Sequence, residues 1–414
     1  MHKHLKMVGD FSPLVLKSAL KSHWVCKFES TFCSHNFERL LNKTNKHVIT
    51  SNTSLQAISA ELIQNYTLLE RALFLQCGDC VIQLQSNSSP LLDELAHYFR
   101  HISIAPTAAD MGVIAIDCPD PVLAYPFQDW PREAGKKGRK DVFYDTEGGR
   151  LIRKFRTGMV FLQSETHRVA AGPCLANPNQ VINFINNQHM NWLQQHNWLI
   201  CHAAAVVYND KSYAIAAFSG GGKSTFMLRL MDNENINFLS NDRLFIRDEN
   251  GVEAEGIAKL PRINPGTIVT NPRLQGLIPE KNREQLLELP QQQLWDLEQK
   301  YDVDIESIYG EDRIAGAKPL QAFIVLNWQH GSEDDCQVTK VDLNKRRDLL
   351  APIMKSSGPF YQDKKGHFLT RNAALNEQNY LSILSKVSVY EVSGKVDFAA
   401  LQSYFQQKIS AEAE

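Results

Sequence analysis

The residues best suited to chemistry form the run Ser219-Gly-Gly-Gly-Lys-Ser-Thr225, in which glycines precede a lysine and two hydroxyl residues. A strand-like run, Ser212–Phe218, comes directly before it, and a helix-like run, Phe226–Met231, follows it. Glycines let backbone N–H groups surround phosphate oxygens, and the N-terminus of the next helix adds the positive end of its dipole. This order of strand, loop and helix predicts a phosphate-binding loop (P-loop) that holds a nucleotide.

The chemistry of the P-loop residues assigns them separate roles. Lys223 is expected to reach the β- and γ-phosphates of ATP, and the hydroxyl of Ser224 is expected to bind Mg²⁺. The usual pattern starts with glycine, whereas this chain has Ala217 at that position. The residues predicted to bind the nucleotide are Ser219, Gly220, Gly221, Gly222, Lys223, Ser224 and Thr225.

An aspartate follows the next strand of the predicted sheet. Ile236–Ser240 is typical of a strand, and Asn241-Asp242 ends it. In an open α/β sheet, the strand ends beside the phosphate loop are where ligands bind. Asp242 then has two open roles, as a Mg²⁺ ligand or as the base that takes the proton of an acceptor hydroxyl. The structural alternative is a turn aspartate beside Arg243.

A histidine is placed near the P-loop by hairpin arithmetic. Leu199–Tyr208 and Ser212–Phe218 are strand-like and are separated by Asn209-Asp210-Lys211, where Asn-Asp indicates a tight turn. A two-residue turn pairs Tyr208 with Lys211 and puts His202 opposite Ala217, and a three-residue turn puts it opposite Phe218. We therefore expect His202 at the mouth of the loop, where it orients Asp242 or contacts the transferring phosphoryl group.

A third polar cluster is the rigid segment Lys259-Leu-Pro-Arg-Ile-Asn-Pro-Gly266, in which two prolines fix φ. It offers Lys259, Arg262 and Asn264 to a phosphoryl group or an acidic acceptor, although an ordinary surface turn is an equal alternative. Two weaker candidate groups lie further along the chain. Arg313 and Lys318 are candidates for a cationic clamp on the phosphoryl group, and Glu253 and Glu255 are candidate ligands for a second Mg²⁺.

An α/β framework is expected to position these residues. The chain is expected to contain four regions: a polar extension (1–50), a small α/β domain (51–125), a basic connector (126–158) and the P-loop domain (159–414). The connector carries nine Lys or Arg against five acids. It is either a solvated hairpin turning at Glu147-Gly148-Gly149 or a docking surface for an acidic partner or a nucleotide. The expected helices are Leu55–Ala72, Leu91–Phe99 and Asn179–Trp198, and further expected strands are Leu73–Leu75, Val81–Leu84, Val113–Ile116 and Ala322–Leu326.

Composition and net charge argue against nucleic-acid-binding, membrane-spanning and secreted proteins. The 414 residues carry a formal net charge of −2, which gives no global attraction to nucleic acid or to an anionic membrane. No apolar run reaches the length of a bilayer span, and the N-terminus lacks the features of a signal peptide. We expect a cytoplasmic protein with reduced cysteines, in which the pair Cys77 and Cys80 lies in a turn and binds no zinc.

The segment 202–242 resembles the catalytic domain of the bacterial HPr serine kinase/phosphorylase. The matching residues are His202, Ser219–Thr225 and Asn241-Asp242, with Asn241 standing where that family has the first acid of a pair. The resemblance implies that His202 assists, Lys223 binds phosphate, Ser224 binds Mg²⁺ and Asp242 accepts the proton. It also implies an α/β, phosphoenolpyruvate carboxykinase-like P-loop kinase domain with a smaller N-terminal α/β domain.

Longer phrases resemble the HPr kinase-related kinase B family, from about residue 55 to beyond residue 330. Examples are SNSSPLLDELAHYF, GPCLANPNQVINFINNQHMNWL and FLSNDRLFI. The resemblance implies ATP and Mg²⁺ as cofactors and ATP-grasp-type or amphi-Trp proteins as partners. The expected activity is transfer of the γ-phosphoryl group to a hydroxyl, with Ser or Thr of a protein partner preferred. A small-molecule kinase, an ATP-sensing module without efficient transfer, and a homo-oligomeric state remain open.

Overall fold

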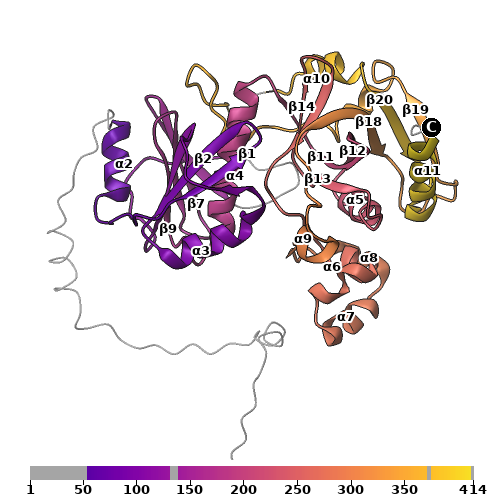
Figure 1. The fold of residues 1–414 in the computed structure, drawn as a ribbon, viewed down its shortest axis with the longest axis horizontal. Coiled ribbons are helices and arrows are strands. Elements are labelled where there is room, and N and C mark those ends of the chain that lie inside the picture. Colours follow the sequence, from indigo (N-terminus) through magenta and orange to yellow (C-terminus); the bar gives the residue numbers. More distant parts are fainter. Residues whose placement is uncertain (1–53, 131–138, 371–373, 412–414) are drawn as a thin grey trace, which may run out of the picture. The chain divides into compact units, whose positions relative to one another are not determined.

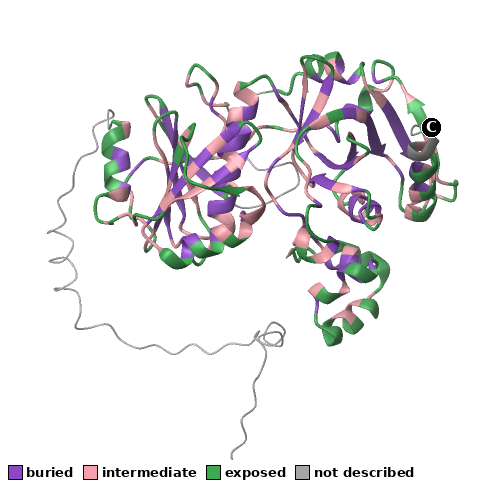
Figure 2. Ribbon diagram, in the orientation of Figure 1, coloured by how far each residue is buried: buried purple, intermediate pink, exposed green. Residues whose placement is uncertain are grey.

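The computed structural model describes residues 54–130, 139–370 and 374–411, which form an α/β fold with two large mixed sheets (Figure 1). The expected polar extension, residues 1–50, lies outside the described residues. Within the described ranges, no helix has both the length and the apolar character that crossing a bilayer requires. Figure 2 shows the strands of both sheets as mostly buried and helix α7 (Glu280–Leu287) as largely exposed.

The first sheet has the strand order β3-β1-β2-β4-β9-β8-β7-β6-β5. Strands β2, β4 and β9 run parallel, and the remaining pairs are antiparallel. Its strands are β1 (Leu73–Cys77), β2 (Cys80–Ser86), β3 (Ser103–Ile104), β4 (Met111–Asp117), β5 (Gln128–Asp129), β6 (Asp141–Thr146), β7 (Gly149–Lys154), β8 (Val160–Ser164) and β9 (Arg168–Gly172). The predicted turn at Cys77 and Cys80 is confirmed, since these two residues pair across the β1–β2 hairpin.

Helices cover both faces of the first sheet. Helices α3 (Ser89–Tyr98) and α4 (Pro178–Gln195) pack on β2, and α2 (Leu55–Ile63) packs on β8 and β9. Helix α2 is shorter than predicted, because the chain turns away after Ile63. The Leu69 N–H instead donates to the Ser86 carbonyl at 2.9 Å, which holds this part of the chain beside the end of β2. The sequence pattern could not show this competing backbone bond.

The segment 126–158, expected as a connector, contributes β5, β6 and β7 to the first sheet. The predicted turn is confirmed, because Thr146 pairs with Gly149 and Gly148 has a φ of 71°. The expected boundary at residue 158 lies between β7 and β8, which are paired strands. Apolar residues of the segment, such as Phe143, enter the core and make it part of the sheet.

The second sheet contains the P-loop. Its main path is β10-β14-β15-β18-β12-β11-β13, and β20 pairs with β18 and with β19. Strand β18 runs parallel to β12 and β20. The strands are β10 (Leu199–Cys201), β11 (Ala203–Tyr208), β12 (Lys211–Ala217), β13 (Asn237–Ser240), β14 (Leu244–Asp248), β15 (Val252–Gly256), β18 (Lys318–Leu326), β19 (Gln337–Val341) and β20 (Ser388–Ser393).

Both faces of the second sheet are buried, and its central strands are accordingly mostly apolar. In β11, Ala204 and Val206 join one core with helices α5 (Lys223–Leu230) and α11 (Phe398–Ala411), whereas Ala203 and Ala205 face the other core with α10 (Glu377–Leu384). This double burial fixes the strands that carry the P-loop. The remaining elements are α6 (Pro265–Val269), α8 (Gln291–Asp296), α9 (Ile305–Tyr309), the short strands β16 (Arg262–Ile263) and β17 (Tyr301–Asp302), and the 3₁₀ turns Arg100–Ile102, Pro272–Leu277 and Arg347–Leu350.

The weaker sequence candidates have other roles in the fold. Arg313 is 8% exposed, and its guanidinium donates to the carbonyls of Tyr309, Met231, Asn233 and Ile236 at 2.6–3.0 Å. It therefore ties the end of α5 to β13 and α9, and the interpretation as a phosphate clamp is wrong.

The other three candidates also lie away from the P-loop cavity. Lys318 pairs with Asp210 at the hairpin turn at 2.8 Å. Glu253 and Glu255 lie on β15, where they face Arg247 and His189, respectively. Neither glutamate lines the cavity at the P-loop, so they are not placed to hold a second Mg²⁺ there.

We expect Arg313→Met to lower the free energy of unfolding by at least about 3 kcal/mol, because each buried carbonyl left without a donor costs about 1–3 kcal/mol. Urea denaturation followed by circular dichroism measures the change. Arg156→Met removes an exposed arginine from the first sheet's β7–β8 connection and should stay within about 0.5 kcal/mol of the unmodified protein. Equal stability of the two variants would contradict the assigned role.

Candidate functional site

The P-loop connects the end of β12 to the start of α5. Gly220 and Gly222 have φ values of 80° and 85°, which L-residues rarely adopt. A Cβ at Gly222 would also lie 2.7 Å from the ring of Phe398, so both the backbone angle and the lack of space require glycine there. Ala217 is an extended residue of β12, and its conformation does not need a glycine. The predicted strand, loop and helix are all present.

The hairpin that precedes the loop has the register of the two-residue turn, the first of the two that the sequence allows. Asn209 and Asp210 occupy the left-handed region, with φ values of 47° and 57°, and Tyr208 pairs with Lys211. The ladder ends at Ala203, because the His202 N–H turns away and donates to the Ile353 carbonyl at 2.7 Å. The expected single strand over residues 199–208 is thus divided into β10 and β11. The break at His202 lets its side chain line the P-loop cavity.

Asp242 lies at the centre of a charged cluster. Its carboxylate is 3.2 Å from the His202 Nε2, 3.9 Å from the Lys223 Nζ, 3.6 Å from the Arg243 Nε and 3.7 Å from the Lys355 Nζ. Strand β13 pairs with β11 and delivers the aspartate beside the loop two residues after Ser240. The structure therefore brings the three predicted catalytic residues, His202, Lys223 and Asp242, into one site.

The cluster fixes the ionisation of its members. Burial raises the pKa of Asp242, but the hydrogen bond from His202 and the charges of Lys355, Lys223 and Arg243 outweigh it, so this pKa lies well below its usual value. The bond to Asp242 raises the pKa of His202, yet burial and the two lysines prevail and lower it. At neutral pH the pair is a carboxylate and a neutral imidazole that donates to it.

Lys355 is a member of the cluster that the sequence interpretation missed. Met354 forms an isolated bridge with Cys201, next to the bond between Ile353 and His202. This short pairing carries the following residue, Lys355, to Asp242. No local pattern in residues 350–358 marks the lysine, since its role depends on a contact with a distant strand.

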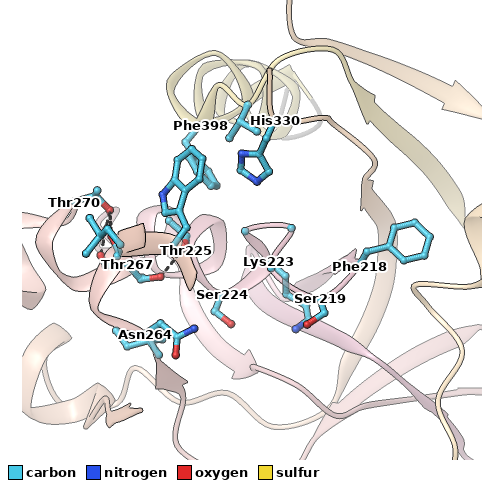
Figure 3. Close-up of a pocket in the computed structure, with 18 of the residues that line it drawn as sticks. Phe218, Ser219, Lys223, Ser224, Thr225, Asn264, Thr267, Thr270, His330 and Phe398 are labelled. Atoms are coloured by element: carbon cyan, nitrogen blue, oxygen red, sulfur yellow. Dashed lines mark hydrogen bonds between the residues drawn. The ribbon is translucent and has the colours of Figure 1, made fainter. Parts of the chain in front are cut away.

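A cavity of about 520 Å³ surrounds the P-loop. Figure 3 shows Lys223, Ser224 and Ser219 on one side of it and His330 and Phe398 on the other. Trp295 and His330 have ring centroids 4.4 Å apart, and Trp328 and Phe398 have centroids 4.8 Å apart. This aromatic wall suits the face of a nucleobase. The sequence interpretation missed it, because its members come from three separate segments.

The Trp328 indole Nε1 donates to the Gly221 carbonyl at 3.0 Å, so the wall also supports the loop. Thr225 is bonded through its hydroxyl to the hydroxyl of Thr267 on α6 at 2.8 Å (Figure 3). Its predicted contact with a nucleotide would therefore come mainly from the backbone. Of the cationic segment, Arg262 and Asn264 line the P-loop cavity, whereas Lys259 does not.

A second cavity of about 310 Å³ adjoins the first. The two cavities share Lys223, Ser224, Asp242, Arg262 and Lys300. The second is additionally lined by Ser240, Asn241, Arg243, Ile257, Lys259 and Leu260. The predicted residues Lys259, Arg262 and Asn264 are therefore divided between two neighbouring spaces, with Asp242 and Lys223 at their junction.

The oxygen atoms at this junction fit Mg²⁺, which prefers hard oxygen ligands and keeps several from water or phosphate. Ser224 and Asp242 supply a hydroxyl and a carboxylate, and the Asn264 Oδ1 is buried with no hydrogen-bond partner in the described structure. No group of three or more His, Cys, Asp or Glu among the described residues could hold a metal by itself. A Mg²⁺ here would depend on the phosphates for most of its ligands.

No protein-family model and no curated protein matches this chain. Among solved structures, the HPr(Ser) kinase/phosphatase from Coxiella burnetii is similar over 52% of this chain and 93% of that chain. The sequence identity is 11% and the TM-score is 0.26. It is thus a distant structural neighbour.

We expect Lys259 to lose its proton near pH 8. Burial and repulsion from Arg243 and Arg262 disfavour its ammonium form and lower its pKa from 10.5 to about 8, despite the attraction of Asp242. Between these two pH values the folded protein holds fewer protons at this site than the unfolded chain, so this group makes stability rise with pH there. An NMR titration of ¹³C-labelled lysine side chains measures the midpoint, and Lys259→Met identifies the signal. A midpoint near 10.5 would contradict the placement of Lys259.

Proposed function

We propose that this protein is an ATP-dependent phosphotransferase that moves the γ-phosphoryl group to a hydroxyl acceptor. The observation that carries the proposal is the position of Asp242 within 3.2 Å of His202 and 3.9 Å of Lys223, where the P-loop cavity meets a second cavity. Phosphoryl transfer needs a phosphate cradle and, beside it, a group that orients the attacking hydroxyl. A nucleotide sensor would need the cradle alone.

Each side chain has a role in this scheme. The P-loop amides and Lys223 hold the phosphates, and the aromatic wall of Trp295, Trp328, His330 and Phe398 holds the base. Asp242 stays ionised, accepts the hydrogen bond of the acceptor hydroxyl and takes its proton as the new bond forms. His202 donates to Asp242 and fixes its orientation. Bound Mg²⁺, held by Ser224 and Asp242, would neutralise phosphate charge.

The order of elements supports a kinase domain of the HPr kinase type on a phosphoenolpyruvate carboxykinase-like fold. Between residues 202 and 242 the chain has four features in order. They are the histidine between β10 and β11, the P-loop, helix α5, and the aspartate after β13. The same relationship would make ATP-grasp-type or amphi-Trp proteins candidate partners, and it fits a cytoplasmic kinase.

The basic segment 126–158 would favour a protein acceptor if its positive charges were available for docking. In the described part of this segment, four basic side chains have acidic partners within the first sheet and its loops. The pairs are Arg139–Asp129, Arg150–Asp145, Arg153–Asp120 and Lys154–Asp141. Much of the local charge is therefore balanced internally, and Arg150 is buried. Lys136 and Lys137 lie outside the described residues. This internal pairing favours the alternative in which the acceptor is a small molecule.

We expect Lys223→Ala to weaken binding of Mg·ATP by roughly 10-fold to 150-fold, because a hydrogen bond to a charged group contributes about 1.5–3 kcal/mol. Isothermal titration calorimetry measures the affinity. Lys340→Ala on β19 removes an exposed lysine and is the matched control, with no expected change. Unchanged affinity in folded Lys223→Ala protein would remove the basis for a nucleotide site at the P-loop.

We expect Asp242→Asn to lower the rate of phosphoryl transfer by about 10²–10⁴-fold, because the amide cannot accept the proton. The rate is measured as label passing from γ-³²P-ATP to acceptors in an extract of the source cells. A parallel titration of Mg·ATP separates the two roles of the carboxylate, since loss of a metal ligand would also weaken binding. Transfer at the normal rate would rule out Asp242 as the base, and no transfer by the unmodified protein would favour a nucleotide sensor.

A further inference from the structure

The second cavity, which adjoins the P-loop, is strongly cationic. Its lining contains Lys223, Arg243, Lys259, Arg262 and Lys300 and a single carboxylate, that of Asp242. Burial and the neighbouring positive charges already disfavour the ammonium form of Lys259. Cations gathered in a partly desolvated space repel one another, and an anion that enters the space relieves this repulsion. The cavity is therefore built for a negatively charged occupant.

The nucleotide itself does not account for this charge. Arg243 and Lys259 line the second cavity and not the P-loop cavity. The Arg243 Nε is 3.6 Å from the Asp242 Oδ2, so the guanidinium lies beside the proposed base. A guanidinium presents a planar set of donors that matches a carboxylate or a phosphate. These two residues thus mark an anion position on the side of Asp242 away from the P-loop cavity.

An uncharged group in the same cavity points to a hydroxyl compound. Asn241 lines the second cavity, and its Oδ1 is buried with no hydrogen-bond partner among the described residues. Buried polar atoms in native proteins are almost always satisfied, so this acceptor needs a donor from a bound molecule or a water. Asn241 and Asp242 are adjacent in sequence, and together they could receive two hydroxyl donors of one ligand.

The size of the cavity favours a small molecule. At about 310 Å³, it is at the lower end of the range for small-molecule sites, about 300–1,000 Å³. A serine or threonine of a protein would bring a neutral side chain and leave Asp242 as the one carboxylate lining the cavity to balance Arg243 and Lys259. A compact compound that carries both a hydroxyl and an anionic group would satisfy the base and the cations together.

We propose that the cavity lined by Asn241, Arg243 and Lys259 is the acceptor subsite, and that it takes a small hydroxyl compound bearing a phosphate or a carboxylate. This subsite rests on the proposed phosphotransferase function. The acceptor oxygen forms a bond to the γ-phosphorus as the bond from that phosphorus to the β–γ bridging oxygen breaks. The hydroxyl proton passes to Asp242 and then to solvent, and ADP leaves.

The binding test uses three probes that share hydroxyl groups and differ in charge: glycerol, glycerate and glycerol 3-phosphate. Each is titrated by calorimetry into protein saturated with Mg²⁺ and AMP-PNP, which fills the P-loop and does not transfer its phosphoryl group. We expect at least one anionic probe to bind ten or more times as tightly as glycerol. The stronger of the two anions identifies the preferred group. Equal binding of all three would overturn the subsite.

Variants locate the anion. Arg243→Met and Lys259→Met should each weaken the preferred anionic probe by at least tenfold, while retained AMP-PNP affinity shows that the protein is folded. Lys259→Arg should restore binding, because it returns the charge. Lys340→Met, the exposed control on β19, should bind the probe as the unmodified protein does. If Arg243→Met and Lys259→Met also bind it normally, the anion lies elsewhere and the subsite is wrong.

A transfer experiment separates the subsite from the function on which it rests. Extract of the source cells is divided into small molecules and macromolecules, and each fraction is incubated with the protein and γ-³²P-ATP. Label in an anionic small molecule is the expected result. Label in protein alone would overturn the subsite and leave the phosphotransferase standing. No label in either fraction, with ATP bound, would overturn the phosphotransferase function and the subsite with it.

Discussion

The site depends on one electrostatic constraint, the balance between the Asp242 carboxylate and the cations around it. Lys223, Arg243 and Lys355 each lie within 4 Å of this carboxylate, and His202 donates to it. Removal of the carboxylate would leave several positive charges facing one another in a partly buried space, which is costly. The aspartate therefore organises the apo site before any substrate arrives. It keeps a negative charge available at the place where a hydroxyl must be oriented.

The fold supplies this balance from separated parts of the chain. The apolar strands β11 and β12 are buried on both faces and hold the P-loop in place. The break between β10 and β11 lets the His202 side chain lie in the cavity, and the bridge to Met354 places Lys355 beside Asp242. Asp242 and Arg243 thus lie between the ends of β13 and β14, Lys355 follows a residue bridged to β10, and Lys223 begins helix α5. Strand ends are suited to this purpose, because their side chains can leave the sheet while their backbone stays fixed.

Local sequence patterns were enough to predict the strand, loop and helix around residues 219–225 and the hairpin before them. GGGKST carries its own geometry, and the Asn-Asp turn sets the hairpin register by counting residues. Contacts set by long-range pairing were not predictable in this way. Lys355 and the aromatic wall come from distant segments, and the end of α2 is decided by a bond from Leu69 to β2. Arg313 shows the opposite error: a basic residue near a predicted site was interpreted by its charge, although burial gave it a structural role.

The support of the P-loop by Trp328 and Phe398 has a consequence for the order of events during synthesis. The loop and its helix are complete at residue 230, but the indole that bonds to Gly221 and the ring that contacts Gly222 are made about a hundred and more residues later. Contacts so far apart in sequence close slowly and late. A nascent chain that has emerged only to the end of α5 therefore has the phosphate-binding sequence without its lateral support. Competence to hold a nucleotide should arise only when the segment after β18 and helix α11, which carry these two rings, have docked.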